Sequence, residues 1–350
     1  MAQAIVKAPK VLEADPQRRR TDMTEKRHAP KALVLAAFAA VYVLWGSTYL
    51  AIRFAVATMP PFLLAGVRFT IAGVILSAFA LARGAARPTR ENWKAAAIAG
   101  TLLFPLGNGV VVWAETRIDS SMAALLVATE PFWVVLLLWL RAGVRPRPFV
   151  IAGIVAGFVG LIMLVGRSSV PGAGADVLSA AALVGASISW AAGSLYARKA
   201  PLARSPLLSA GMQMIAGGIA LLLLGALTGE PSRLDVATVS TRSVVAFGYL
   251  VIFGSLVGFS AYSWLVTVAA PARVATYAYV NPVIAVLLGW ALAGEAITTR
   301  ILIAAAVIIG AVALIVADQS RATGNVPTTG EFAAVHKADG TSNSRERRTA

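Results

Sequence analysis

The chain has 350 residues, of which 58% are hydrophobic and 13% charged, and its mean hydropathy is +0.75. Soluble domains carry about 25% charged residues, so too few charges are present to cover a water-facing surface, which argues strongly against a soluble enzyme. The net charge of +15 is typical of nucleic-acid-binding proteins, but the positions of the charges give another explanation, described below. The chain has no cysteine, which excludes disulfides and thiolate metal sites.

A helix that crosses the hydrocarbon core of a membrane needs about 20 mostly apolar residues. Ten segments approach or meet this length, and their residues do not alternate between apolar and polar as in a membrane β-barrel. We therefore predict an all-α integral membrane protein. Its ten transmembrane helices are expected, in chain order, at 32–55, 62–82, 95–115, 120–140, 149–166, 177–197, 206–228, 243–267, 272–293 and 301–317.

The two ends of the chain differ from this apolar region. Residues 1–31 are rich in Lys and Arg, and residues 318–350 are polar. Both have the composition of disordered segments, so we predict a disordered basic tail before the first span and a disordered polar tail after the last.

The distribution of basic residues predicts the orientation. Cytoplasmic loops of membrane proteins carry an excess of Lys and Arg. Most of the 31 Lys and Arg residues lie in segments that share one side of the membrane if ten spans are present: 1–31, 83–94, 141–147, 198–204 and 318–350. This bias predicts a multi-pass protein of the cell inner membrane with both termini in the cytoplasm. It also explains the high pI without a nucleic-acid partner.

The two halves of the apolar region repeat each other. Aligned pairs include Trp45 with Trp190, Arg53 with Arg198, Gly66 with Gly211, Gly73 with Gly218, Gly107 with Gly258 and Pro131 with Pro282. Because each half holds five spans, an odd number, the second half enters the membrane from the opposite side. Such inverted repeats are typical of secondary transporters, which bind substrate between the halves near the middle of the membrane. We expect repeats at 32–166 and 177–317.

Four segments carry a resemblance to a known family: WGSTYLAIRFA (45–55), LAGVRFTIAGVIL (64–76), SMAALLVATEPFWVVLLLWL (121–140) and GSLVGFSAYSWLVTVAAPARVATYAYVNPVIAVLLGWALAGEAIT (254–297). With them the chain resembles the drug/metabolite transporter superfamily, specifically its ten-helix exporters with two EamA domains, over about residues 32–317. The resemblance implies export of amino acids, metabolites or toxic compounds. One feature departs from the pattern, because Glu295 follows the fourth helix of the second half and the first half has no such acid.

Glu130 is the sharpest candidate for a functional group. It lies near the middle of the fourth predicted span, where an ionised carboxylate is costly unless it faces a wet cavity, pairs with a cation or is protonated. We expect it in the substrate or proton pathway, and a structural pair with Arg68 is the alternative. The aligned residue in the second half is the neutral Asn281.

Three prolines are expected to shape the helices that carry these groups. Pro131 and Pro282 directly follow Glu130 and Asn281, and Pro105 lies before a Gly-Asn-Gly stretch in the third span. Proline removes one helical hydrogen bond and kinks or opens a helix. The kinks expose backbone carbonyls beside the candidate site or, equally well, serve packing alone.

Aromatic and amide side chains could complete a pocket for an amphiphilic small molecule. The candidates are Trp45, Tyr262, Tyr277 and Asn108, although membrane Trp and Tyr also serve as interface anchors. Arg68 has three alternatives: snorkelling to the outer interface, pairing with Glu130, or binding a carboxylate of the substrate. Snorkelling or pairing is favoured.

The sequence thus predicts a secondary active transporter, an exporter of small amphiphilic metabolites, amino acids or drugs that works by alternating access. A small-molecule substrate and the lipid bilayer are its partners, and protons are a candidate coupling ion. The alternatives are an intramembrane lipid-modifying enzyme and a non-transporting membrane receptor. Both histidines, His28 and His336, lie in the tails, and no phosphate-binding loop occurs, so no metal, cofactor or ATP is expected. Substrate identity and oligomeric state stay open.

Overall fold

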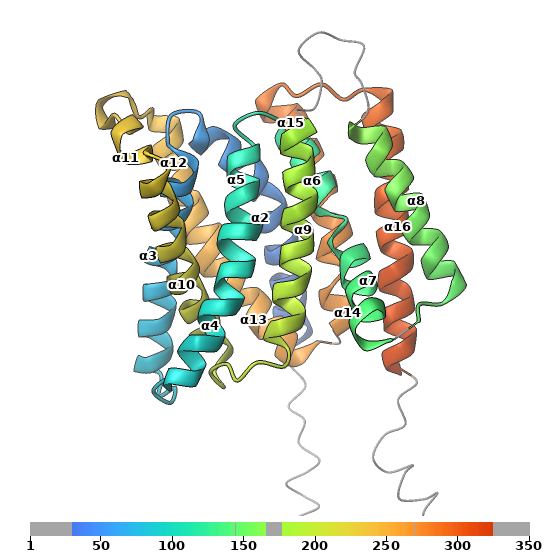
Figure 1. Cartoon of the computed structure of the whole chain (residues 1–350), viewed down its shortest axis with the longest axis horizontal. Helices are drawn as coiled ribbons and strands as arrows, with labels where there is room; N and C mark the ends of the chain where they lie inside the picture. Colours follow the sequence, from blue (N-terminus) through green and yellow to red (C-terminus); the bar gives the residue numbers. More distant parts are fainter. Residues whose placement is uncertain (1–29, 144, 166–176, 270, 325–350) are drawn as a thin grey trace, which may run out of the picture.

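A computed structural model describes residues 30–143, 145–165, 177–269 and 271–324 of the chain. Every regular element in these ranges is helical, as predicted (Figure 1). The first half forms α2 (Lys31–Val56), α3 (Pro61–Ala82), α4 (Arg90–Leu103), the π-helix η1 (Phe104–Gly109), α5 (Val110–Ala114), α6 (Ser120–Val127), α7 (Glu130–Ala142) and α8 (Pro148–Val165). The second half forms α9 (Val177–Ala197), α10 (Pro206–Leu227), α11 (Glu230–Arg233), the 3₁₀-helix η2 (Val236–Thr238), α12 (Thr241–Tyr249), the π-helix η3 (Leu250–Val257), α13 (Gly258–Val268), α14 (Pro271–Val274), α15 (Tyr277–Ala293) and α16 (Thr299–Gly324).

Eight helical stretches in the described part are long and apolar enough to cross a membrane, and they coincide with eight of the predicted spans. The fifth and ninth predicted spans correspond to the shorter apolar helices Pro148–Met163 and Tyr277–Ala293. The 17 residues of α15 extend about 25 Å at 1.5 Å per residue, slightly less than a hydrocarbon core of about 30 Å. That these two helices also cross the membrane stays a prediction.

Short sequence signals set several helix ends. Pro61 begins α3, a position at which the missing N–H of proline is not needed. Thr89 and Asn92 form a reciprocal capping box at the start of α4. Gly143 and Gly294 follow α7 and α15 with φ of 65° and 68°, the left-handed region in which glycine ends a helix without strain.

Four of the predicted spans are interrupted. Pro105 lies in the first turn of η1, and η3 forms in the eighth span without any proline. Residues 128–129 separate α6 from α7, and residues 275–276 separate α14 from α15. Because π-helical turns are frequent at functional sites, the third and eighth spans are candidates for lining a site.

Helices α3 and α10 approach each other through glycines. A Cβ atom built on Gly73 would lie 2.7 Å from the carbonyl oxygen of Gly211, and one built on Gly218 would lie 3.0 Å from that of Gly66. Small residues allow helix backbones to come this close in a membrane. The two halves of the chain therefore meet backbone to backbone along this pair.

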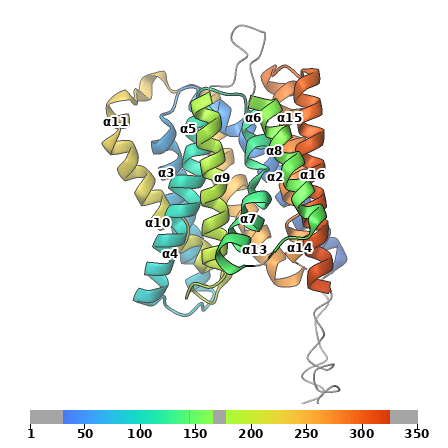
Figure 2. The same cartoon turned by 45° about the vertical axis from the view of Figure 1, so that its right-hand side comes forward.

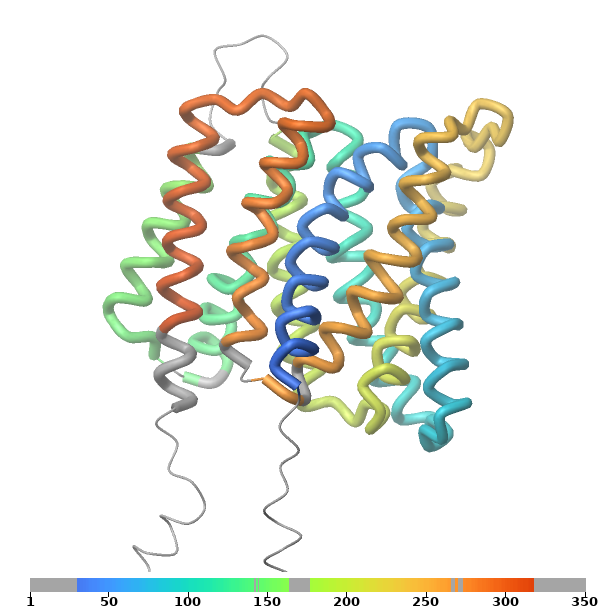
Figure 3. The backbone as a smooth tube through the Cα atoms, turned by 180° about the vertical axis from the view of Figure 1, so that it is seen from behind, coloured from blue at the N-terminus to red at the C-terminus, as the bar shows by residue number. Residues whose placement is uncertain are grey.

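Other helices also pack across the halves. Helix α2 lies between α13 and α15 (Figure 3), and α9 lies against α4 and α7. Helix α8 runs beside α16 at one edge of the bundle (Figures 1 and 2). The core is thus built from helices of both halves.

The loops 83–89 and 198–205 lie at the same end of the bundle. Asn92 Nδ2 donates a hydrogen bond to the carbonyl oxygen of Pro201 at 2.8 Å, and Leu202 packs on a cluster that contains Ala96. Helix α2 starts at this end and α16 runs toward it (Figure 3). We call it the inner end, after the predicted orientation, and the opposite end the outer end.

The predicted C-terminal tail begins too early. Helix α16 continues to Gly324, so the expectation of disorder from residue 318 is wrong for 318–324. No glycine or proline precedes Gly324 in this stretch, and extending an existing helix adds one hydrogen bond for each residue fixed. The rest of that tail, 325–350, and residues 1–29 of the N-terminal tail lie outside the described residues.

The glycine contacts predict how the bundle responds to a larger side chain. Gly73→Leu should destabilise the protein by about 1–3 kcal/mol or more, because its side chain meets the backbone of α10. Gly185→Leu is the control, since a Cβ on Gly185 meets nothing within 4 Å. Thermal unfolding in detergent measures both. Equal unfolding temperatures for the two variants would show that the α3–α10 contact is not close.

Candidate functional site

Two adjoining cavities occupy the middle and inner part of the bundle. The wider one has a volume of about 600 Å³ and the narrower one, deeper in the bundle, about 110 Å³. The wide cavity reaches the protein surface at the inner end, because Arg198 and Pro206 line it and are exposed. Six residues, drawn from both halves of the chain, line both cavities: Trp45, Glu130, Trp190, Phe259, Tyr277 and Ala278.

Trp45 of α2 is the centre of an aromatic wall. Its ring centroid lies 5.2 Å from that of Phe259, 5.1 Å from Tyr262 and 5.3 Å from Tyr277, distances at which aromatic rings attract each other. Its Nε1 donates a hydrogen bond to the carbonyl oxygen of Gly254 at 3.2 Å. The structure therefore brings the three predicted aromatic residues together in one wall of the cavities.

Trp190 of α9 faces the same cavities from the opposite half, and the sequence analysis did not select it. A Cβ on Gly107 would lie 2.9 Å from Cε3 of Trp190, just as a Cβ on Gly258 would lie 2.5 Å from Nε1 of Trp45. Each tryptophan thus packs on a glycine of the other half. The alignment of Trp45 with Trp190 was the signal that could have identified it.

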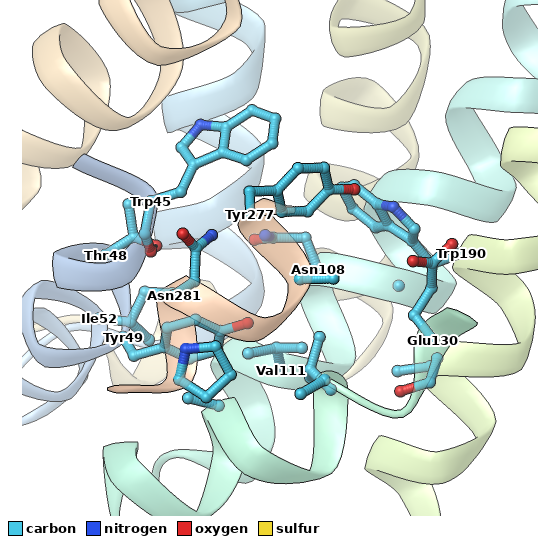
Figure 4. A pocket seen from close by; sticks show the side chains of 18 of the residues that line it. Trp45, Thr48, Tyr49, Ile52, Asn108, Val111, Glu130, Trp190, Tyr277 and Asn281 are labelled. Atoms are coloured by element: carbon cyan, nitrogen blue, oxygen red, sulfur yellow. Dashed lines mark hydrogen bonds between the residues drawn. The ribbon is translucent and has the colours of Figure 1, made fainter. Parts of the chain in front are cut away.

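Glu130 begins α7 and lines both cavities. The break at residues 128–129 and Pro131 in the first turn of α7 place its side chain at a helix start inside the bundle. Figure 4 shows Glu130 beside Trp190 and across the cavity from Trp45. The side chain is half-buried and makes no ion pair within the described residues, and the charge of Arg198 acts on it.

Arg68 contradicts both favoured sequence interpretations. It is only 3% exposed, so it does not snorkel to the interface, and it is not paired with Glu130. Its Nε donates a hydrogen bond to Ser255 Oγ at 2.9 Å, and its guanidinium stacks 4.6 Å from the ring centroid of Phe69. The physical reason lies in the eighth span, where Gly254 leaves room for the guanidinium: a Cβ there would lie 3.1 Å from Arg68 Nη2.

One guanidinium nitrogen of Arg68 is left without a partner. Nη1 is buried and has no hydrogen bond among the described residues, and the side chain lines the narrow cavity. A buried unsatisfied donor is costly, more so for a charged group. The third sequence alternative, binding of an anionic group of the substrate, stays a prediction.

The two asparagines also line the narrow cavity. When the amide of Asn281 is oriented to satisfy its neighbours, its nitrogen donates to the carbonyl oxygens of Tyr42 at 3.2 Å and Tyr277 at 3.3 Å. Asn108 Oδ1 is buried without a partner among the described residues. The two amides thus differ, since Asn281 is held by backbone groups and Asn108 has an acceptor to offer.

The three predicted prolines have different positions. Pro105 lies in η1 and Pro131 in the first turn of α7, where the helix has just begun. Pro282 lies inside α15, which continues through it, and its span is interrupted earlier, at residues 275–276. The helix is therefore not opened at Pro282, and a kink there stays a prediction.

Comparison with known proteins identifies the family. A model of the EamA-like transporter family matches residues 31–166 and 177–317. The chain belongs to the EamA-like transporter family. The inner membrane transporter YedA of Escherichia coli (strain K12) is 38% identical over 283 residues, which cover 81% of this chain and 90% of YedA. The transporter YvbV of Bacillus subtilis (strain 168) is 23% identical over 83% of this chain and 93% of its own length.

A solved crystal structure of a protein has the same fold, with a TM-score of 0.55 and 23% identity, and the match covers 82% of this chain and 96% of that one. The resemblance to the drug/metabolite transporter superfamily is confirmed by the EamA match and the relatives. This EamA protein is a membrane transporter, so the alternative of a lipid-modifying enzyme is wrong.

The wide cavity can be tested by labelling, because the EamA protein has no cysteine of its own. Ser194→Cys places a thiol in the cavity wall, and we expect a water-soluble maleimide to react with it when added from the inner side. Ala191→Cys, on the same helix and 0% exposed, is the control and should react at least ten-fold more slowly in folded protein. Similar rates at both positions would contradict the cavity.

Proposed function

We propose that the protein is a secondary active transporter that exports small amphiphilic solutes across the cell inner membrane by alternating access. The observation that carries this proposal is a cavity lined by both halves of the chain that reaches the surface at the inner end. A carrier needs such a central site with access from one side at a time. The name of the related YedA supports the inner membrane.

The proposed mechanism has ten transmembrane helices in two inverted repeats, 32–166 and 177–317. Reciprocal contacts support it. A pseudo-two-fold axis exchanges the two residues of each aligned pair, so every contact between the halves should occur a second time between the aligned partners of its two residues. Gly73 meets Gly211 while Gly218 meets Gly66, and the two tryptophan–glycine contacts exchange in the same way. Two such halves can rock between two shapes of similar energy.

The proposed orientation has both termini in the cytoplasm. It is supported by the common location of the basic loops 83–89 and 198–205 at the inner end, which matches the positive-inside rule. The wide cavity then faces the cytoplasm, as an exporter requires when it takes up its substrate. Export itself rests on the resemblance to EamA exporters.

The cavity lining predicts the chemistry of the solute. Aromatic rings of Trp45, Trp190 and Tyr277 cover its apolar body. Arg68 offers a donor to an anionic group, and Glu130 lines the same cavity. A few polar groups in an aromatic wall are typical of a site that orients an amphiphilic ligand. Glu130 is also the proposed site of proton coupling, since an acid in the membrane can exchange protons with solvent only where a cavity reaches it.

Replacing Glu130 tests its role. The substrate is first identified by expressing the chain in a sensitive host against a panel of amino acids and toxic compounds, scored for resistance and accumulation. In proteoliposomes with an imposed pH gradient, Glu130→Gln should then lower flux at least ten-fold, because the amide can neither hold a proton nor attract a cation. Glu91→Gln, at an exposed helix start, should transport normally. Normal flux in Glu130→Gln would remove Glu130 from the mechanism.

Arg68 is tested with the same substrate. Arg68→Gln should weaken transport of an anionic or zwitterionic substrate by about 10- to 100-fold, the effect of losing a hydrogen bond to a charged group, about 1.5–3 kcal/mol. A neutral ester of that substrate should be much less affected. Arg83→Gln, at the exposed end of the same helix, is the control. An equal loss for acid and ester would assign Arg68 to packing alone.

A further inference from the structure

A buried carboxylate, Glu295, joins the two halves of the chain at the outer end of the bundle. Its Oε1 accepts hydrogen bonds from Ser120 N at 2.9 Å and Ser120 Oγ at 2.6 Å, and its Oε2 accepts one from Ser121 N at 3.0 Å. Arg53 Nε lies 3.5 Å from Oε1. These contacts join the segment after α15, in the second half, to the start of α6 and to α2, in the first.

Local sequence explains how the side chain reaches this position. Gly294 ends α15 in the left-handed conformation, and Glu295 N then bonds to the carbonyl oxygen of Gly289 at 3.1 Å, which turns the chain back over the helix. A Cβ on Gly289 would lie only 2.3 Å from Glu295 Oε2. Glycine at 289 therefore leaves the space that the carboxylate fills.

Helix α6 depends on Glu295 for its cap. The first N–H groups of a helix need acceptors from outside it, and Asp119 at the N-cap makes no side-chain cap bond. Asp119 instead pairs with Arg53, at 2.8 Å between Oδ1 and Nη1. Since the carboxylate of Asp119 is engaged with Arg53, the cap of α6 comes from Glu295 in the other half of the chain.

A second acid uses the same chemistry elsewhere in the bundle. Glu230, in α11 after α10, accepts hydrogen bonds from Phe62 N at 3.2 Å and Leu63 N at 2.7 Å at the start of α3. Gly225 provides its space, because a Cβ there would lie 3.2 Å from Glu230 Oε2. Both acids are at most 5% exposed and both cap a helix of the first half from the second.

The two caps differ in the interfaces they span. Glu230 joins α3 and α10, which already touch backbone to backbone, so this contact can stay closed as the hinge between the two halves. Glu295 joins α6 and α15, and both helices line the narrow cavity, α6 through Ala124 and Val127 and α15 through Asn281. An outward-open shape needs the outer ends of α6 and α15 to separate.

We propose that Glu295 is the outer gate of the transporter: it holds α6 against α15 while the cavity faces inward and releases Ser120 and Ser121 when the cavity opens outward. The gate rests on the alternating access proposed above. Glu295 is a positioning residue, because it acts through the helices and does not line either cavity.

The charge of Glu295 supports this role. Burial raises the pKa of Glu295, but the hydrogen bonds from Ser120 and Ser121 lower it by more, and the net pKa lies below its ordinary value. The carboxylate is therefore ionised at neutral pH and attracts both Arg53 and the positive end of the α6 dipole. Asp119 and Glu115 are the other charged groups near Arg53.

Glu295→Gln is the direct test, with Glu230→Gln as the matched control. Glutamine has the same shape but puts an NH₂ group where one of the two cap donors needs an acceptor. The reporter is a single cysteine at Val111, a buried residue in the wall of the narrow cavity, treated with an impermeant maleimide from the outer side. A second reporter, Ser194→Cys, is treated from the inner side.

We expect Glu295→Gln to raise outside labelling at position 111 at least three-fold and to lower inside labelling at position 194. Glu230→Gln should change neither labelling rate. Both variants lose a helix cap, so we expect thermal unfolding to show a similar loss of stability in each. Ser120→Ala removes only the hydroxyl donor and should shift labelling in the same direction by less, which provides a milder variant if Glu295→Gln folds poorly. Unchanged labelling in Glu295→Gln and Ser120→Ala, or equal shifts in Glu230→Gln, would overturn the gate.

Flux measured on the same variants separates the gate from the proposed function. Altered flux without any labelling shift would refute the gate and leave transport intact. A labelling shift in a protein that moves no solute would leave the gate and refute transport. Labelling and flux together therefore test the gate and the transport function separately.

Discussion

Polar groups inside a bilayer need partners from the protein itself, because lipid offers none. This constraint explains why two helix starts are capped by side chains distant in sequence, with Glu295 at the start of α6 and Glu230 at the start of α3. Against this constraint, two buried polar atoms at the narrow cavity stand out because they have no hydrogen-bond partner in the described ranges. Arg68 Nη1 and Asn108 Oδ1 are buried without partners among the described residues, and both side chains line the narrow cavity.

The same constraint separates rigid contacts from movable ones. Helices α3 and α10 meet through Gly73 and Gly211, a packing that no side-chain rotation can loosen. The contact of α6 with α15 combines apolar packing, with Ala123 and Val286 in one buried cluster, with hydrogen bonds to one carboxylate at its outer end. A transporter that works by alternating access needs both a contact that stays closed and a contact that can separate.

Much of this was accessible from the sequence because it depends on local signals. Hydropathy predicts the helices closely, and the alignment of Trp45 with Trp190 carried a signal for two residues that line the cavities. What depends on distant partners was missed or misjudged. Snorkelling of Arg68 was wrong because Ser255 and Gly254, far along the chain, bind it in place. The π-helix η3 contains no proline, and the cap of α6 by Glu295 joins residues far apart in sequence.

The central claim is that the halves rock about a cavity that opens at one end at a time. It is tested most directly with cysteines at Val134, on α7 in the first half, and Ala275, before α15 in the second, both in the wall of the wide cavity. A cleavable thiol-reactive cross-linker that spans this wall should abolish solute flux, and cleaving it should restore flux. Unchanged flux in fully cross-linked protein would contradict the account.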